Sequence, residues 1–226
     1  IHLEPRVQGL QPAAASRRFP SYLAPAMTQL PELPLTLSRQ EIRKMIRQRR
    51  RALTPEQQQE MGQQAATRMM TYPPVVMAHT VAVFLSFDGE LDTQPLIEQL
   101  WRAGKRVYLP VLHPFSAGNL LFLNYHPQSE LVMNRLKIHE PKLDVRDVLP
   151  LSRLDVLITP LVAFDEYGQR LGMGGGFYDR TLQNWQHYKT QPVGYAHDCQ
   201  LVEKLPVEEW DIPLPAVVTP SKVWEW

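Results

Sequence analysis

The sequence predicts an α/β fold, a three-layer α/β/α sandwich around a mostly parallel, Rossmann-like sheet. Strand-like apolar runs alternate along the chain with helical segments of about ten residues, the order that a parallel sheet requires. Hydrophobic residues form 44% and charged residues 21% of the 226 residues, a balance typical of a protein with a buried core. We therefore expect one α/β domain over residues 38–226. Residues 1–37 are rich in proline and lack periodicity, which predicts an irregular lead-in.

Composition also limits the partners of the protein. The chain has 24 basic and 23 acidic side chains and a formal charge of +1, so no general field favours nucleic acid or an anionic membrane. Its single cysteine, Cys199, cannot form an internal disulfide and fits a reducing compartment. No apolar run approaches the roughly 18 residues that a membrane-spanning helix needs. We expect a cytoplasmic protein without a nucleic-acid or membrane partner.

Two capped helices are predicted at the start of the ordered region. Ser38 and Glu41 have the spacing of a capping box, in which each side chain satisfies a free backbone N–H of the other residue. Thr54 begins a second helix over residues 55–70, with proline at its first helical position. The first helix is strongly basic, because residues 39–51 contain seven arginine and lysine side chains and one acid.

The basic side chains of the first helix have two interpretations. At helical spacing, the apolar residues Ile42, Met45 and Ile46 lie opposite a face formed by Arg39, Arg43, Arg47 and Arg50. This face is either a solvated surface or a place where one or two arginines reach a bound polyphosphate. A nucleic-acid surface is disfavoured, because residues 38–60 contain no aromatic side chain on which bases would stack.

The central part of the chain predicts a βαβ unit. Strands over residues 80–87 and 106–111 flank a helix over residues 93–103, so the strands should be parallel with a right-handed crossover. Shorter strands over residues 120–125 and 131–133 are expected to form a hairpin. The later elements are a buried strand over 154–162, a helix over 178–188, and strands over 192–196 and 215–219.

A glycine-rich segment after the buried strand is the strongest signal for chemistry. Gly172, Gly174, Gly175 and Gly176 permit positive φ angles and lack Cβ atoms, so successive N–H groups can surround an anion. The segment fits neither the Walker pattern nor G-x-G-x-x-G, since Phe177 occupies the sixth position. Its place after a strand of a parallel sheet favours a phosphate cradle, with a structural turn as the alternative.

Acidic residues provide the remaining candidates. Residues 84–93 change from an apolar strand to an acidic loop, in which Glu90 could bind an amino-substituted ring or simply be solvated. Asp179 and Asp211 are oxygen ligands of the kind that Mg²⁺ takes together with phosphates, although Asp179 also suits the first turn of a helix. The histidines show no i, i+4 pair for a transition metal.

Three segments together resemble one enzyme family. They are Ser-x-x-Glu-Ile-Arg from residue 38, Phe-Leu-Ser-Phe-Asp-Gly-Glu-Leu-Asp-Thr from residue 84, and Phe-Asp-x-x-Gly-x-Arg-Leu-Gly-x-Gly-Gly-Gly-Phe-Tyr-Asp-Arg from residue 164. This combination, over about residues 38–220, resembles the 5-formyltetrahydrofolate cyclo-ligases. The resemblance implies a monomeric cytoplasmic enzyme that uses ATP and Mg²⁺. It would cyclise 5-formyltetrahydrofolate, with or without a polyglutamate tail, to 5,10-methenyltetrahydrofolate through a phosphorylated formyl intermediate, releasing ADP and phosphate.

The resemblance also implies roles for single residues. The positions that contact the nucleotide are Arg39, Arg43, Arg170, Leu171, Gly172, Met173, Gly174, Gly175, Gly176, Phe177 and Tyr178. Those that contact the folate are Leu85, Glu90, Met173, Gly174, Gly175, Gly176 and Phe177. Asp179 and Asp211 match the magnesium positions, and Arg170 and Tyr178 are the candidate catalytic residues. Some relatives have a basic residue in this loop, where the present chain has Met173 and Gly175, so arginines and magnesium must supply the positive charge.

Two other classes of function, another enzyme or a binding module, remain open from the residues alone. An α/β fold of this kind also hosts sugar-phosphate isomerases and enzymes that handle acyl-CoA. The basic helix would alternatively suit a nucleotide-binding or RNA-binding module, for which steeply salt-dependent binding and no turnover are expected.

Overall fold

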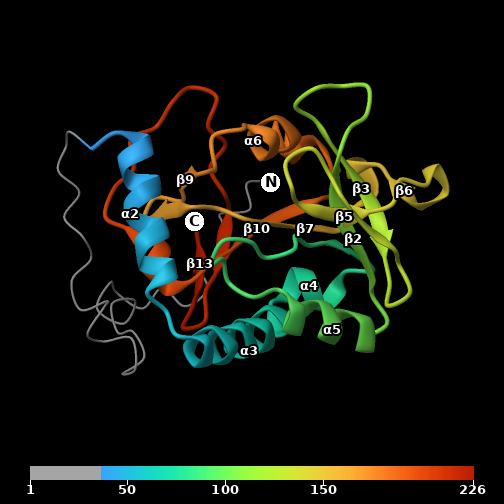
Figure 1. The fold of residues 1–226 in the computed structure, drawn as a ribbon, viewed down its shortest axis with the longest axis horizontal. Helices are drawn as coiled ribbons and strands as arrows, with labels where there is room; N and C mark the ends of the chain where they lie inside the picture. The colour runs from blue at the N-terminus through green and yellow to red at the C-terminus, as the bar shows by residue number, and fades with distance from the viewer. Residues whose placement is uncertain (1–36) are drawn as a thin grey trace, which may run out of the picture.

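The computed structural model describes residues 37–226, in which an eight-stranded sheet runs through the middle of the molecule (Figure 1). The strand order is β13-β12-β10-β7-β1-β2-β3-β6. The strands span β1 Thr80–Ala82, β2 Arg106–Leu112, β3 Leu120–Tyr125, β6 Val148–Leu149, β7 Val156–Thr159, β10 Gln191–Tyr195, β12 Ala216–Val218 and β13 Val223–Glu225. Neighbours from β12 to β2 are parallel, and β13, β3 and β6 are antiparallel to their neighbours. The predicted α/β fold with a mostly parallel sheet is confirmed.

Helices cover one face of this sheet. They are α3 Pro55–Thr71, α4 Pro73–Met77 and α5 Gln94–Arg102, which lie together below the sheet in Figure 1. Buried side chains of α3 and α5, among them Met69 and Leu100, pack in one core with Val81 and Ile158 of the sheet. The helix α5 connects β1 to β2, which are parallel with Val81 opposite Val107, so the predicted βαβ unit is confirmed.

The opposite face is covered by a short helix, a small sheet and loops. The helix α6 spans Phe177–Leu182, and the three-stranded sheet β11-β8-β9 consists of Leu201–Val202, Ala163–Asp165 and Arg170–Leu171. Leu182 and Phe164 bury their side chains against Leu157 and Val217 of the main sheet. Because β8 follows β7 and β11 follows β10 after short connections, the small sheet extends from the carboxyl edge of the main one.

The first helix of the described residues, α2 Arg39–Arg51, packs on the small sheet and stands at one end of the described part of the chain (Figure 1). Its predicted capping box is present, with the Ser38 hydroxyl 3.1 Å from the Glu41 backbone N. Ile42 and Ile46 are fully buried against residues of the small sheet, including Leu171. Of the two interpretations of the arginine face, a fully solvated surface is wrong. Arg43 and Arg50 are buried as well, because loops pack against the flanks of the helix.

Several strands differ from their predicted bounds and partners. The first strand stops at Ala82, beyond which the Phe84 carbonyl accepts a hydrogen bond from the Thr93 hydroxyl at 2.7 Å. The buried strand β7 is also shorter than predicted, since the chain continues into the small sheet. The expected hairpin between residues 120–125 and 131–133 is wrong. Instead β3 pairs with β2, and β4 Leu131–Met133 pairs with β5 His139–Pro141.

The remaining elements are short turns of helix. The helix predicted over residues 178–188 divides, because α6 ends at Leu182 and Asn184 adopts a φ of +61° before a 3₁₀ turn at Trp185–His187. Further 3₁₀ turns lie at Val145–Asp147, Leu151–Arg153 and Asp198–Gln200. No helix within the described residues is long and apolar enough to span a membrane. The predicted lead-in lies outside the described residues except for Leu37, and the single domain over residues 38–226 stays a prediction.

Candidate active site

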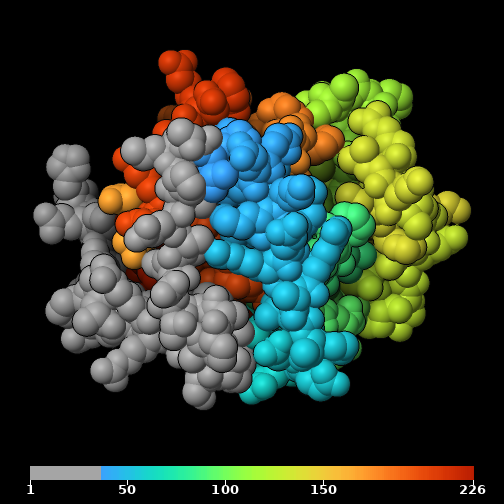
Figure 2. All heavy atoms as spheres, turned by 60° about the vertical axis from the view of Figure 1, so that its left-hand side comes forward, coloured from blue at the N-terminus to red at the C-terminus, as the bar shows by residue number. Residues whose placement is uncertain are grey.

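A cavity of about 300 Å³ opens at the carboxyl edge of the main sheet. Its walls come from the first turns of α2, residues 84–90, the glycine-rich segment and the β4–β5 hairpin. Figure 2 shows α2 (blue to cyan) at the surface, with α6 (orange) beside its upper end and the region of the hairpin (yellow to green) beyond. Four segments far apart in the sequence therefore meet where ligands bind open parallel sheets.

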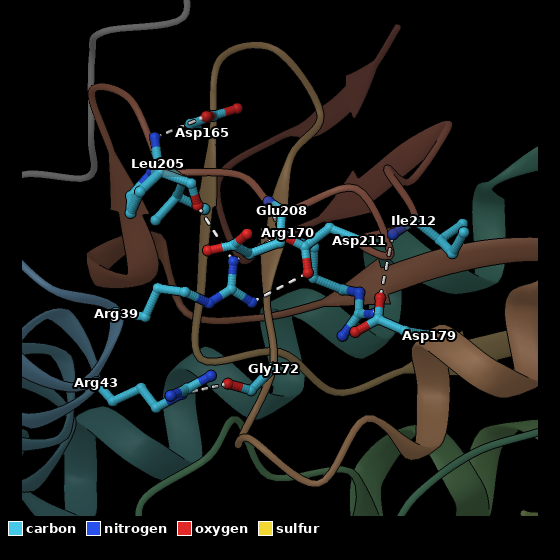
Figure 3. A network of polar contacts seen from close by, with 11 residues as sticks. Arg39, Arg43, Asp165, Arg170, Gly172, Asp179, Leu205, Glu208, Asp211 and Ile212 are labelled. Carbon is cyan, nitrogen blue, oxygen red and sulfur yellow. Dashed lines mark hydrogen bonds and ion pairs between the residues drawn. The ribbon is translucent and has the colours of Figure 1, made fainter.

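The glycine-rich segment forms one wall of the cavity and is held by α2. The Arg43 Nε donates a hydrogen bond of 2.7 Å to the Gly172 carbonyl (Figure 3). Gly174 adopts a φ of +107°, a conformation that side chains with a Cβ rarely take. A Cβ on Gly174 would lie 3.7 Å from the Arg43 guanidinium, so this side chain of α2 lies close to the backbone of the loop. Residues 172–176 line the cavity, and the assignment of this loop as a phosphate cradle stays a prediction.

Two arginines of the site are paired with carboxylates (Figure 3). Arg170, which is buried on β9, pairs with Asp179 at the start of α6, and these two residues join the ends of the glycine-rich segment. Arg39 donates to both carboxylate oxygens of Asp211, at 2.6 and 3.0 Å. Backbone N–H groups complete both pairs, because Asp179 accepts from Ile212 at 3.1 Å and Asp211 from Glu208 at 2.8 Å.

These pairs bear on the predicted magnesium site. Asp179 and Asp211, the two predicted ligands, each face an arginine guanidinium, which competes with a cation for the same oxygens. Within residues 37–226 no group of three or more His, Cys, Asp or Glu side chains is arranged to hold a metal ion. The residues as they lie thus do not form a magnesium cage, and the assignment of Asp179 and Asp211 to this metal stays a prediction.

Glu90 forms the opposite wall of the cavity. Glu90 as a whole residue is 8% exposed, and its Oε1 accepts a hydrogen bond of 2.9 Å from the Phe87 backbone N–H. Burial raises the pKa of Glu90 to about 7, although the nearby Arg50 opposes this shift. Burial also raises the pKa of Tyr178, which lines the same cavity, and the charge of Glu90 adds to the effect. The Tyr178 hydroxyl therefore remains a neutral hydrogen-bond donor across the whole physiological range.

The cavity brings together most of the predicted site residues. The described residues that line it include Arg39, Arg43, Leu85, Glu90, Arg170, Gly172, Met173, Gly174, Gly175, Gly176, Phe177, Tyr178 and Asp179. Two predicted residues lie elsewhere. Leu171 is buried in the core against Ile42, so only its backbone can contact a ligand. Asp211 pairs with Arg39 and is not among the described residues that line the cavity.

The sequence analysis missed one wall of the cavity. The hairpin of β4 and β5 contributes Asn134, Leu136, Ile138, His139 and Glu140, and Trp210 lies at another edge. Glu140 fixes the hairpin, because it accepts hydrogen bonds from the Leu112 backbone at 3.1 Å and from Asn134 at 3.0 Å. A short strand pair with little alternation gives no signal that it faces a ligand.

Comparison with known proteins assigns the family. The model of the 5-formyltetrahydrofolate cyclo-ligase family matches residues 36–220. The chain belongs to this family. It is 53% identical over 179 residues to the 5-formyltetrahydrofolate cyclo-ligase of Haemophilus influenzae, covering 79% of this chain and 96% of that protein. The cyclo-ligase of Mycolicibacterium smegmatis is 31% identical over 188 residues, which cover 82% and 95% of the two chains.

A solved structure agrees with this assignment. The solution structure of the Aquifex aeolicus 5,10-methenyltetrahydrofolate synthetase superimposes with a TM-score of 0.72 at 28% identity, covering 84% of this chain and 93% of that one. The family predicted from the three sequence segments is therefore confirmed, and the protein is an enzyme of the cyclo-ligase family.

The raised pKa of Glu90 predicts that this residue destabilises the fold above neutral pH. Between the ordinary pKa of 4.5 and the native value of about 7, the native state binds the proton more tightly than the unfolded chain. Stability is therefore lost as the pH rises through this window. Glu90→Gln removes this ionisation. The free energy of unfolding of the variant, relative to that of the wild type, should therefore rise by on the order of 2 kcal/mol from pH 5 to pH 8.

Urea unfolding of both proteins at the two pH values measures this difference. Glu130→Gln, at an exposed surface carboxylate, controls for the change in net charge. If Glu90→Gln changes the free energy of unfolding equally at pH 5 and pH 8, the pKa of Glu90 is not raised in the folded protein.

Proposed function

We propose that the protein cyclises 5-formyltetrahydrofolate to 5,10-methenyltetrahydrofolate and consumes ATP, with release of ADP and phosphate. Membership of the cyclo-ligase family supports the activity. The observation that favours it most is that one cavity contains both a glycine-rich loop with arginines and a buried carboxylate on the opposite wall. Such a site suits a polyanion and a ring with N–H donors bound side by side.

The proposed reaction needs ATP because the formyl oxygen is a poor leaving group. The formyl oxygen attacks the γ-phosphorus of ATP and ADP leaves. The formyl oxygen then carries the phosphoryl group, so the formyl carbon is bonded to a phosphate as leaving group. Nitrogen 10 of the folate then attacks this carbon and loses its proton. Phosphate departs with the former formyl oxygen, which leaves the methenyl bridge between the two nitrogens. Phosphoryl transfer of this kind depends mainly on positioning and on electrostatic stabilisation.

The nucleotide phosphates would lie against the glycine-rich loop. The backbone N–H groups of residues 171–178 supply donors, and Arg39, Arg43 and Arg170 supply positive charge. Arg43 uses its Nε for the Gly172 carbonyl, so its two terminal nitrogens remain for an anion. Arg170 and Tyr178 are the proposed catalytic residues, as a charge and a neutral donor next to the transferring phosphoryl group. Mg²⁺ would arrive with ATP as the counter-ion of the phosphates.

The folate would lie between this loop and the opposite wall. Leu85 offers an apolar contact, residues 173–177 border both ligands, and Glu90 would accept hydrogen bonds from the amino-substituted pterin ring. An ionised acceptor makes shorter and stronger hydrogen bonds than a neutral one, so Glu90 would bind best when deprotonated. We further propose a monomeric, cytoplasmic enzyme with no nucleic-acid or membrane partner, which accepts folates with or without a polyglutamate tail.

Product formation tests the proposed function directly. Purified protein mixed with ATP, Mg²⁺ and 5-formyltetrahydrofolate should produce the methenyl absorbance and one ADP for each product molecule. A sugar-phosphate isomerase or an acyl-CoA enzyme would consume no ATP with this substrate, and a binding module would show no turnover. Folded protein that forms no methenyl product would refute the proposal.

Gly174→Val should weaken ATP binding while the protein stays folded. A branched side chain resists the φ of +107° and occupies the space next to Arg43, so the backbone cannot approach the phosphates. We expect the KM for ATP to rise at least about tenfold, roughly 1.4 kcal/mol. Gly104→Val is the matched control, because Gly104 has a φ of +76° with no neighbouring atom within 4 Å. If both variants alter ATP kinetics equally, backbone strain rather than the cradle is responsible.

Arg43→Ala should lose more ATP-dependent activity than Arg47→Ala. Arg43 is 6% exposed and touches the loop, whereas the Arg47 side chain is 40% exposed and pairs only weakly with Asp88 at 3.4 Å. The loss of a charge-assisted contact should lower kcat/KM for ATP by the equivalent of about 2 kcal/mol in transition-state stabilisation. The loss of an exposed ion pair should cost well under 1 kcal/mol. Steady-state kinetics at two salt concentrations measure this contrast. Equal losses that shrink together in high salt would indicate a diffuse field instead of a contact.

A further inference from the structure

Arg180 is an arginine next to the glycine-rich segment to which the proposed reaction gives no role. It lies on α6, four positions after Gly176, and it is exposed. It is not among the described residues that line the cavity, whereas Gly175 and Gly176 are. Arg180 therefore approaches the glycine-rich segment from outside the cavity.

The guanidinium of Arg180 joins two loops. Its Nη2 donates a hydrogen bond of 2.5 Å to the Gly175 carbonyl. Its Nε donates one of 2.5 Å to the carbonyl of Gly118, in the loop between β2 and β3. Its Cζ lies 5.3 Å from the centre of the Phe177 ring, close enough for a cation–π contact. An arginine can serve two acceptors in this way, because its N–H groups form a planar fork with fixed directions.

Two glycines leave room for this guanidinium. Gly118 and Gly176 have φ angles of +83° and +70°, in the left-handed region that favours glycine. A Cβ on Gly118 would lie 2.8 Å from the Arg180 Cζ, and a Cβ on Gly176 would lie 2.7 Å from its Nη1. The guanidinium thus fits against both loops because neither position carries a Cβ.

The hydrogen bond from Arg180 fixes the direction of one peptide group in the glycine-rich segment. The peptide bond between Gly175 and Gly176 is trans, so its carbonyl and its N–H point to opposite sides. Because the Gly175 carbonyl points to Arg180, the Gly176 N–H points away from it. Among the described residues, this N–H donates to no acceptor. It is therefore free to bind an anion on the side of the loop away from Arg180.

We propose that Arg180 is a positioning residue for ATP, which holds the peptide group between Gly175 and Gly176 in the orientation that presents the Gly176 N–H to a phosphate. The inference rests on the proposed function, since it takes the anion to be the nucleotide. Arg180 acts through the loop and touches no substrate. Without Arg180 this peptide group can rotate, because the glycines on both sides restrict φ and ψ little. ATP binding would then include the cost of ordering it.

Two simpler roles compete with this one. Arg180 could only add positive charge to the field around the phosphates, or it could only tether the loop between β2 and β3. A field is retained by any cation at this position and is screened by salt. A tether alone changes the stability of the domain, or the binding of both ligands alike. An oriented peptide group instead requires the arginine fork and affects the nucleotide selectively.

The test compares Arg180→Met and Arg180→Lys with the wild type and with Arg68→Met. Arg68 is the matched control, because its Nε donates to the Pro220 carbonyl at 3.2 Å and it is not among the described residues that line the cavity. Calorimetry at low and high salt measures the dissociation constant of AMP-PNP with Mg²⁺, an ATP analogue that does not readily transfer its γ-phosphate. Steady-state kinetics give the KM values for ATP and 5-formyltetrahydrofolate.

The proposal predicts a specific pattern. Arg180→Met should weaken AMP-PNP binding about three- to tenfold, as expected for one lost hydrogen bond, and raise the KM for ATP by a similar factor. The KM for 5-formyltetrahydrofolate should change less than about twofold, because Leu85 and Glu90 are unaltered. Arg180→Lys should recover less than half of the loss, since an ammonium group has no fixed fork. The loss should be equal at low and high salt, and Arg68→Met should bind the analogue as the wild type does.

Other outcomes overturn the inference. It is wrong if Arg180→Met binds the analogue as tightly as the wild type, or if both KM values rise together. It is also wrong if Arg180→Lys recovers more than half of the loss, or if the loss disappears in high salt. Arg180→Met that fails to fold would show that these contacts stabilise the whole domain, which likewise contradicts a role confined to the loop.

The proposed function is tested separately. Wild-type protein that forms no methenyl product but binds the analogue refutes the proposed function, while calorimetry still reports whether Arg180 positions the loop. Wild-type protein that does not bind the analogue refutes the role of Arg180 as well.

Discussion

The contact between α2 and the glycine-rich loop is the interaction on which the site depends. Arg43 reaches a carbonyl 129 positions later in the chain, and Ile42 and Ile46 fix the helix on the small sheet that carries the loop. The same helix places Arg39 in the lining of the cavity and Arg50 beneath the turn that carries Glu90. One amphipathic helix therefore ties the two walls of the cavity together, and the distance between the proposed nucleotide and folate positions follows from its packing.

The site concentrates charge in a place where charge is costly to bury. Arg50, Arg170 and Glu90 are each less than a tenth exposed, and Arg50 and Arg170 retain N–H groups without a partner among the described residues. Such groups lower stability unless a ligand or a neighbour balances them. Asp179 and Asp211 balance Arg170 and Arg39 in the structure. Bound phosphates would have to share the arginines with these carboxylates or displace the carboxylates. The free energy of opening the arginine–carboxylate pairs would then contribute to the affinity for the nucleotide.

The sequence predicted what local chemistry determines. The capping boxes and the βαβ unit appear as expected, and within the glycine-rich segment Gly174 and Gly176 adopt the positive φ angles that glycine permits. Pairings between distant segments were not predictable in the same way, as the wrong partners of residues 120–125 and 131–133 show. Helical periodicity placed Arg43 and Arg50 on a polar face, but it contains no information on the loops that bury them. Leu171 belongs to the predicted loop, but as a residue of strand β9 it points its side chain into the core, while the glycines that follow it line the cavity.

Hydrogen–deuterium exchange with ligands tests the central claim, that α2 holds two ligand-binding walls at one cavity, most directly. ATP with Mg²⁺ should slow exchange of the backbone amides in residues 172–178, and 5-formyltetrahydrofolate should slow it in residues 85–90, with the largest protection when both are bound. Protection confined to segments away from the cavity, with these two segments unchanged by either ligand, would contradict the account.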